Sequence, residues 1–146
     1  MNLKLSKGEV LLKELKIGSS LEGFMRIKET GKDIGNSIFR DKDKLKEYLL
    51  CIDEVLCNCI YHAYKGELGN INVKFYDDED YLRVSVRDYG SGIPIKYTKE
   101  IPGLSDNLLS ESGRGLVIVN SMCDKLLIKR NENSGTEVII YFKKGW

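Results

Sequence analysis

The spacing of apolar residues changes along the chain from a helical period to an alternating one near residue 70. Residues 41–64 give the clearest helical pattern, with Asp41 as a candidate N-cap, and their apolar positions follow one helix face: Leu45, Leu49, Ile52, Leu56 and Cys59/Ile60. A second helix is predicted to begin near Ser20, and its apolar residues include Leu21, Phe24, Met25 and Ile27. Residues 10–17, VLLKELKI, fit a strand or a short helix.

After residue 70 apolar and polar residues alternate, which is the period of a strand with one buried face. Two such strands joined by the acidic turn DDED predict a β-hairpin whose inward positions are Ile71, Val73, Phe75, Leu82, Val84 and Val86. The second strand ends at Asp88, and YGSGIP after it is predicted as a loop because it holds two glycines and a proline. Residues 95–112 show no convincing period.

From Gly113 the segment GRGLVIVNSMCDKL predicts a glycine turn that leads into a helix, with Leu116, Val119 and Met122/Cys123 inside. A second hairpin closes the chain, formed by KLLIKR, the turn NENSG and TEVIIYFKK. Helices on one side and hairpins on the other predict an α/β (α+β) two-layer sandwich, with a mixed, mainly antiparallel sheet covered on one face by helices. A length of 146 residues predicts a single domain over residues 1–146.

Composition narrows the class of protein. Charged residues make up 31% of the chain and hydrophobic ones 42%, and the net charge of +1 gives no electrostatic case for binding nucleic acid or an anionic membrane. No apolar run is long enough to span a bilayer, and charges interrupt the N-terminal stretch, so we expect no signal peptide and a cytoplasmic protein. The four cysteines form no C-x-x-C pair and are predicted to be small buried residues in a reducing cytosol.

The stretch CIDEVLCNCIYHAYKG, residues 51–66, places three polar residues at intervals of four: Glu54, Asn58 and His62. In a helix these residues and Tyr61 fall within one arc of ~100°, away from the apolar stripe. Taken alone, the arc is better interpreted as a solvated helix face. A single histidine is also more often a surface residue than a catalyst.

Of three later motifs, two allow both a structural and a functional interpretation, and the third needs only a structural one. Asp88 could cap backbone N–H groups of a turn, or accept a hydrogen bond from a ligand's amino group while Gly90 and Gly92 let the ligand approach bare backbone. Residues 113–115, G-R-G, could form an ordinary loop-to-helix turn or a cluster of N–H groups suited to phosphate, although the spacing matches neither the P-loop nor the Rossmann motif. Thr136 follows a sound hairpin turn and is an ordinary strand residue.

The order of these motifs along the chain favours the functional interpretation over the structural one. The chain reads E-x-x-x-N-x-x-x-H-A on a helix, D-x-G-x-G after a strand, G-x-G-L opening a helix, and G-T entering the final strand. This series resembles the GHKL (Bergerat-fold) ATP-binding domain. Within that group NCIYHAY and GRGLVIVNSMCDKL…NSGTEVIIYF are most similar to the anti-sigma-factor serine kinases, and the resemblance covers residues 15–143.

The resemblance implies a site for ATP and Mg²⁺. Asn58 would coordinate Mg²⁺ on the phosphates, and Glu54 would be the general base of phosphoryl transfer. Asp88 would bind the adenine amino group with support from Thr136, and residues 95–112 would form the ATP lid. The adenine would pack against Gly90 and Gly92, and the phosphates would be held by Gly113, Arg114 and Gly115.

The same resemblance implies the partners. Such a kinase binds a sigma factor, phosphorylates a serine of a small anti-anti-sigma (STAS-type) protein, and is usually a homodimer. The alternative is a non-catalytic ATP-binding anti-sigma or adaptor module, which would not need Glu54. A catalytic fragment of a histidine kinase and an α/β domain with coincidental motifs also remain open, and His62 is assigned no chemical step.

Overall fold

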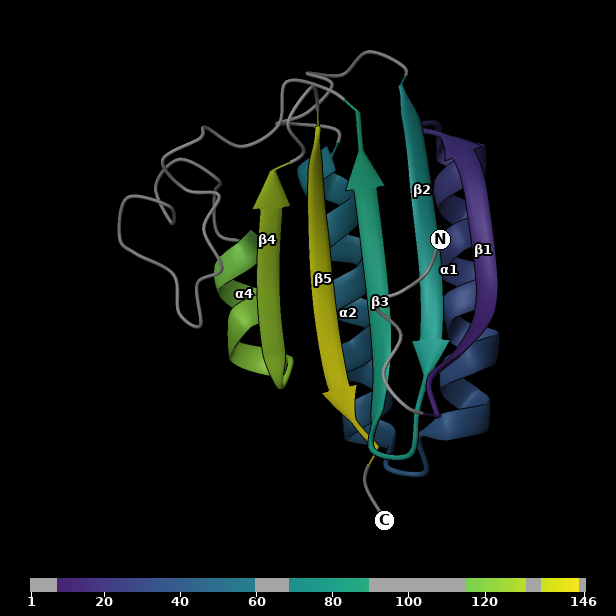
Figure 1. The fold of residues 1–146 in the computed structure, drawn as a ribbon, viewed down its shortest axis with the longest axis vertical. Helices are drawn as coiled ribbons and strands as arrows, with labels where there is room; N and C mark the ends of the chain where they lie inside the picture. Colours follow the sequence, from purple (N-terminus) through teal and green to yellow (C-terminus); the bar gives the residue numbers. More distant parts are fainter. Residues whose placement is uncertain (1–7, 60–68, 90–114, 131–134, 145–146) are drawn as a thin grey trace.

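The computed structural model describes residues 8–59, 69–89, 115–130 and 135–144, and these form two layers (Figure 1). The helical layer consists of α1 (Leu21–Ile38), α2 (Lys42–Asn58) and α4 (Gly115–Met122). The sheet consists of β1 (Val10–Gly18), β2 (Asn70–Asp77), β3 (Tyr81–Asp88), β4 (Lys125–Arg130) and β5 (Thr136–Lys143). The strand order is β1-β2-β3-β5-β4, and each of the four pairings is antiparallel. The two-layer fold and both predicted hairpins are confirmed, and the strands described contain no parallel pair.

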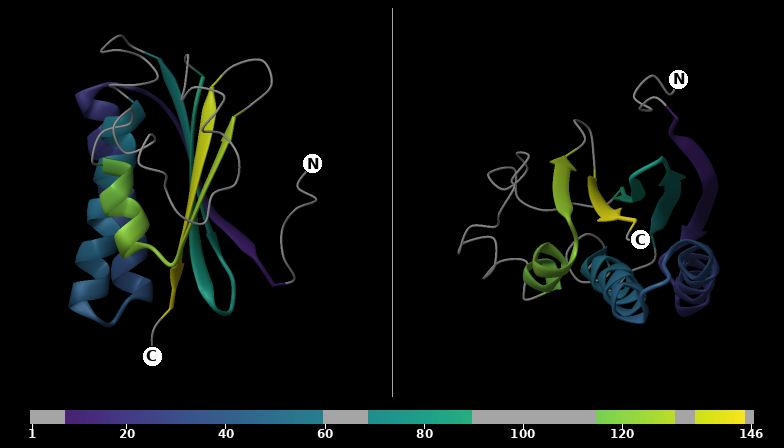
Figure 2. Two further views of the ribbon diagram at one scale, coloured as in Figure 1. Left: turned by 90° about the vertical axis from the view of Figure 1, so that its left-hand side faces the viewer. Right: turned by 90° about the horizontal axis from the view of Figure 1, so that it is seen from below.

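The helices lie side by side on one face of the sheet, in the order α4, α2, α1 (Figure 2). The middle helix, α2, therefore packs against a helix on each flank as well as against the sheet. Its buried residues are Tyr48, Cys51, Ile52, Val55 and Leu56. The predicted apolar stripe was partly wrong, because Leu45 and Leu49 are only partly buried and Tyr48, Cys51 and Val55 take the central positions.

Residues 10–17 are a strand. They belong to β1, an edge strand that pairs with β2 from Gly18↔Asn70 to Val10↔Asp77, with an irregularity between Leu11 and Lys13. Just before β1, the Glu9 carboxylate receives two hydrogen bonds of 2.9 Å from the Arg83 guanidinium on β3. Since the Glu9 and Arg83 side chains are 5% and 15% exposed, this ion pair holds the first residues of the edge strand across β2.

Helix α1 begins where the sequence predicts, because the Ser20 side chain accepts a hydrogen bond of 3.1 Å from the Gly23 N–H. Its buried positions recur every four residues and are mostly glycines: Gly23, Ile27, Gly31 and Gly35. Of the apolar residues that indicated this helix, Ile27 is buried and Phe24 packs against the core, whereas Leu21 and Met25 are 77% and 60% exposed.

Glycines on α1 make room for Tyr48 of α2. A Cβ on Gly35 would lie 2.6 Å from Tyr48 Cε2, and the Tyr48 hydroxyl donates a hydrogen bond of 2.7 Å to the Gly31 carbonyl. The Tyr48 ring also packs against Phe39 and Phe142, with ring centroids 5.1 and 5.4 Å away. This aromatic cluster ties both long helices to strand β5.

The cysteine prediction is confirmed for Cys51 and Cys59, which are buried, and wrong for Cys57, which is exposed. Side chains two positions apart on a helix point in different directions, so those of Cys57 and Cys59 lie in different environments. Burial raises the pKa of the Cys51 thiol to about 12 and that of Cys123, which is partly buried, to about 11. Within the described segments no helix is long and apolar enough to cross a membrane.

Replacing Gly35 with alanine tests the close packing of α1 and α2. Glycine-to-alanine substitutions inside helices normally stabilise by about 0.5–1 kcal/mol. Here we expect the opposite sign, a loss of about 1–3 kcal/mol, because the added methyl meets the Tyr48 ring. Denaturant unfolding followed by circular dichroism measures the change. Asn36→Ala, at the next and exposed position of α1, is the matched control and should leave stability unchanged or slightly raised.

Candidate functional site

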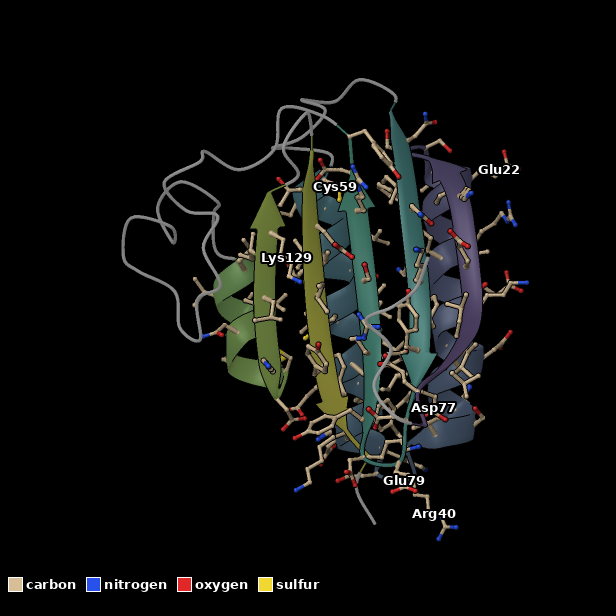
Figure 3. All side chains as sticks on the ribbon, in the orientation of Figure 1. Glu22, Arg40, Cys59, Asp77, Glu79 and Lys129 are labelled. Atoms are coloured by element: carbon tan, nitrogen blue, oxygen red, sulfur yellow. The ribbon has the colours of Figure 1, made fainter. Side chains whose placement is uncertain are left out.

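The candidate residues that the structure describes gather at one end of the molecule. The last turns of α2, the end of β3 and the start of β5 lie at the upper end in Figure 1, and α4 begins beside α2. In Figure 3 Cys59 marks this end, whereas Asp77 and Glu79 mark the β2–β3 turn at the opposite end. The antiparallel order of β3 and β5 produces this meeting, because the last residue of one strand faces the first of the other.

Glu54 lies against the first residue of α4. It is partly buried, and a Cβ on Gly115 would lie only 2.8 Å from Glu54 Oε2. Because the first N–H groups of a helix have no partner within the helix and carry partial positive charge, a carboxylate is favoured at this position. The structure therefore brings together two predicted site residues that stand on different helices.

Asn58 is the last residue of α2 and lies one turn beyond Glu54, also partly buried. The next residue, Cys59, is 3% exposed and caps the helix. Burial raises the pKa of the Cys59 thiol far above its ordinary value, and the negative charge of the Asp88 carboxylate raises it further. The end of α2 and the end of β3 lie at the same end of the molecule (Figure 1).

Asp88 and Thr136 meet across strands β3 and β5. Asp88 is 5% exposed and Thr136 is 1% exposed, and the Thr136 N–H donates a hydrogen bond of 3.2 Å to Asp88 Oδ1. The sequence left open whether Asp88 caps a backbone N–H or binds a ligand. The structure shows the first role, and the second is compatible with it because a carboxylate can accept several hydrogen bonds.

Gly135 belongs to the G-T motif, but the sequence analysis assigned it no role of its own. Its φ is +81°, and a Cβ there would clash with the Asp88 carbonyl oxygen. The sequence signal was present in the turn NENSG, which explains the positive φ but not the contact. Gly135 thus lets the chain enter β5 directly against the end of β3.

Five of the nine predicted site residues fall within the described part of the chain: Glu54, Asn58, Asp88, Gly115 and Thr136. Two contacts link them in pairs, Glu54 with Gly115 and Asp88 with Thr136. Four predicted site residues lie outside the described residues, namely Gly90, Gly92, Gly113 and Arg114, and so do His62 and the predicted lid.

A separate cavity of about 430 Å³ lies at the β1–β2 edge of the sheet. It is lined by Tyr89 and by residues of these two strands, and not by Glu54, Asn58 or Asp88. The candidate site is therefore defined by its side chains and backbone contacts rather than by this cavity.

Comparison with known proteins agrees with the geometry. The family model described as the histidine kinase-like ATPase domain matches residues 30–142. The serine-protein kinase RsbW of Staphylococcus epidermidis is 26% identical over 138 residues, which cover 90% of this chain and 87% of that protein. The serine-protein kinase RsbW of Bacillus cereus is 27% identical over 136 residues, covering 90% and 85%.

Two solved structures share the fold. The RsbU and RsbW domains of Rv1364c from Mycobacterium tuberculosis align with a TM-score of 0.59 at 16% identity, over 89% of this chain and 32% of that one. The catalytic domain of the histidine kinase ThkA aligns with a TM-score of 0.55 at 17% identity, over 91% and 98%. The family resemblance and the predicted fold are thus confirmed.

Gly135→Ala tests the close contact between β5 and β3. We expect it to destabilise the protein by about 2–4 kcal/mol, because it combines an unfavourable positive φ with a clash against the Asp88 carbonyl. Gly8→Ala is the matched control, since Gly8 has a φ of +84° and open space around its Cβ position. That control should cost about 1–2 kcal/mol, from the positive φ alone. Equal losses of unfolding free energy in the two variants would contradict the contact.

Proposed function

The chain belongs to the histidine kinase-like ATPase domain family, and from this we propose that it is an ATP-dependent protein-serine kinase with anti-sigma activity. In this proposal it binds a sigma factor and phosphorylates a serine of an anti-anti-sigma (STAS-type) protein. The RsbW relatives, which are named serine-protein kinases and match 90% of the chain, support the proposed activity. A homodimer of single-domain chains is part of the same proposal.

Glu54 and Asn58 carry the proposal. They lie one turn apart on α2, both partly buried, beside the end of β3 and the start of α4. Mg²⁺ prefers oxygen ligands and takes few from the protein when phosphates supply the rest, so the amide oxygen of Asn58 fits such an ion. When bound, Mg²⁺ would offset the charge of the ATP phosphates.

Glu54 is proposed as the general base. Its carboxylate would accept the proton of the substrate serine as the serine oxygen bonds to the γ-phosphorus of ATP. The bond from that phosphorus to the β–γ bridging oxygen breaks, and ADP leaves. A purely nucleotide-binding module would not need a general base at this position.

Asp88 is proposed to bind the adenine amino group. Its Oδ1 accepts a hydrogen bond from the Thr136 N–H, which helps to fix the orientation of the carboxylate. Gly90 and Gly92 remain predictions for the adenine, as do Gly113, Arg114 and Gly115 for the phosphates.

The chemical step is tested by Glu54→Gln. We expect serine phosphorylation of the anti-anti-sigma protein to fall by about 10²–10⁴-fold, because the amide cannot take the proton, while nucleotide affinity changes little. Transfer is measured with purified proteins and labelled Mg-ATP, and affinity by calorimetry. Asn58→Ala should instead weaken Mg-dependent nucleotide binding. A parent protein that binds ATP but phosphorylates no candidate would favour the non-catalytic module.

The base-recognition step is tested by Asp88→Asn. The asparagine oxygen can still accept the Thr136 N–H, so we expect thermal stability to change little. Its amide N–H₂ would face the adenine amino group as donor against donor, and ATP affinity should fall by about 10-fold or more. Calorimetric titration with ATP measures this, and unchanged affinity would remove Asp88 from the site.

A further inference from the structure

We infer that Gly115 is a positioning residue for Glu54, because the absence of a side chain at Gly115 leaves the space that the Glu54 carboxylate occupies. This inference rests on the proposed kinase function, in which Glu54 is the base. It gives Gly115 a role distinct from holding phosphates, since that role would use its backbone N–H alone.

The contact distances separate the carboxylate from the rest of Glu54. A Cβ on Gly115 would lie 2.8 Å from Glu54 Oε2, but 3.7 Å from the Glu54 carbonyl oxygen and 3.8 Å from the Glu54 Cβ. The two longer distances are ordinary van der Waals contacts. The backbones of α2 and α4 would therefore tolerate a methyl group at Gly115, and the Glu54 carboxylate at its present place would not.

The two helices are held where they are by other contacts. Leu116 and Val119 of α4 are fully buried, and the Cys51 thiol of α2 lies 3.9 Å from the Val119 carbonyl oxygen. The Glu54 side chain is by comparison flexible. An alanine at Gly115 would consequently displace the carboxylate rather than α4, and a base displaced by about 1 Å can cost on the order of 100-fold in rate.

The backbone of Gly115 does not itself require glycine. Positive φ values occur among the described glycines at Gly8 and Gly135 and not at Gly115. Alanine can therefore adopt the same backbone and keeps the N–H group. An effect of Gly115→Ala that disappears when Glu54 is replaced therefore reports the contact between the added methyl group and Glu54.

The kinetic test compares Gly115→Ala with the parent protein. We expect the kcat of phosphoryl transfer to fall by about 10–100-fold while the ADP dissociation constant stays within about 3-fold. In a Glu54→Gln background the same change should have no further effect on residual transfer. It should also have a smaller effect in a Glu54→Asp background, because the shorter side chain leaves room for the methyl. Gly18→Ala, whose Cβ would meet nothing closer than 4.0 Å, is the matched control.

The inference would be overturned if Gly115→Ala weakened ADP binding as much as it lowered kcat. It would also be overturned if this variant transferred phosphate as fast as the parent protein. A second readout uses the protein without nucleotide, and thus holds even if the parent transfers no phosphate and the proposed function fails. Gly115→Ala should lower the melting temperature by a few degrees with Glu54 present, and should leave it unchanged or raise it in a Glu54→Ala background. Equal shifts in both backgrounds would show that the methyl meets something other than Glu54.

Discussion

The packing of Tyr48 against the glycines of α1 fixes the rotation of α2 about its own axis, and the candidate site depends on that rotation. The Tyr48 side chain is fully buried, bonded to the Gly31 carbonyl and pressed against Gly35. Glu54 follows six residues later and therefore points about 120° away from Tyr48 around the helix. With Tyr48 directed at α1, Glu54 faces the opposite flank, where α4 begins. The small residues of α1 thus help to direct Glu54 toward α4, on the far side of the helical layer.

Two glycines then allow the remaining parts of the site to approach, for different physical reasons. At Gly135 the positive φ disfavours a side chain, and a Cβ would also clash with the Asp88 carbonyl oxygen. At Gly115 the close approach is to the end of a flexible side chain, Glu54 Oε2, and the backbone is ordinary. A substitution at Gly135 is consequently expected to cost more stability than one at Gly115, whose main expected effect is to displace the Glu54 carboxylate.

The resulting arrangement places two anionic side chains around the end of α2. Glu54 lies at the start of α4 and Asp88 at the end of β3, with Asn58 and Cys59 on the helix between them. Asp88 is already held by a backbone hydrogen bond, and the missing side chain of Gly115 leaves the space that the Glu54 carboxylate occupies. Groups fixed before a ligand arrives need little rearrangement on binding, which is the condition that precise proton and phosphoryl transfer requires.

Local signals in the sequence determined the helices, the hairpins and the chemical identity of the site residues. The caps at Ser20 and Asp41 and the alternation after residue 70 act over a few neighbouring residues, so they can be recognised without the fold. Only the tertiary structure decided that residues 10–17 pair as a strand with β2, that Tyr48 rather than Leu45 fills the core, and that Cys57 is exposed. It alone also brought Glu54 to Gly115 and Gly135 to Asp88. These outcomes depend on which surfaces meet in space, and contacts between distant segments leave no periodic trace in the chain.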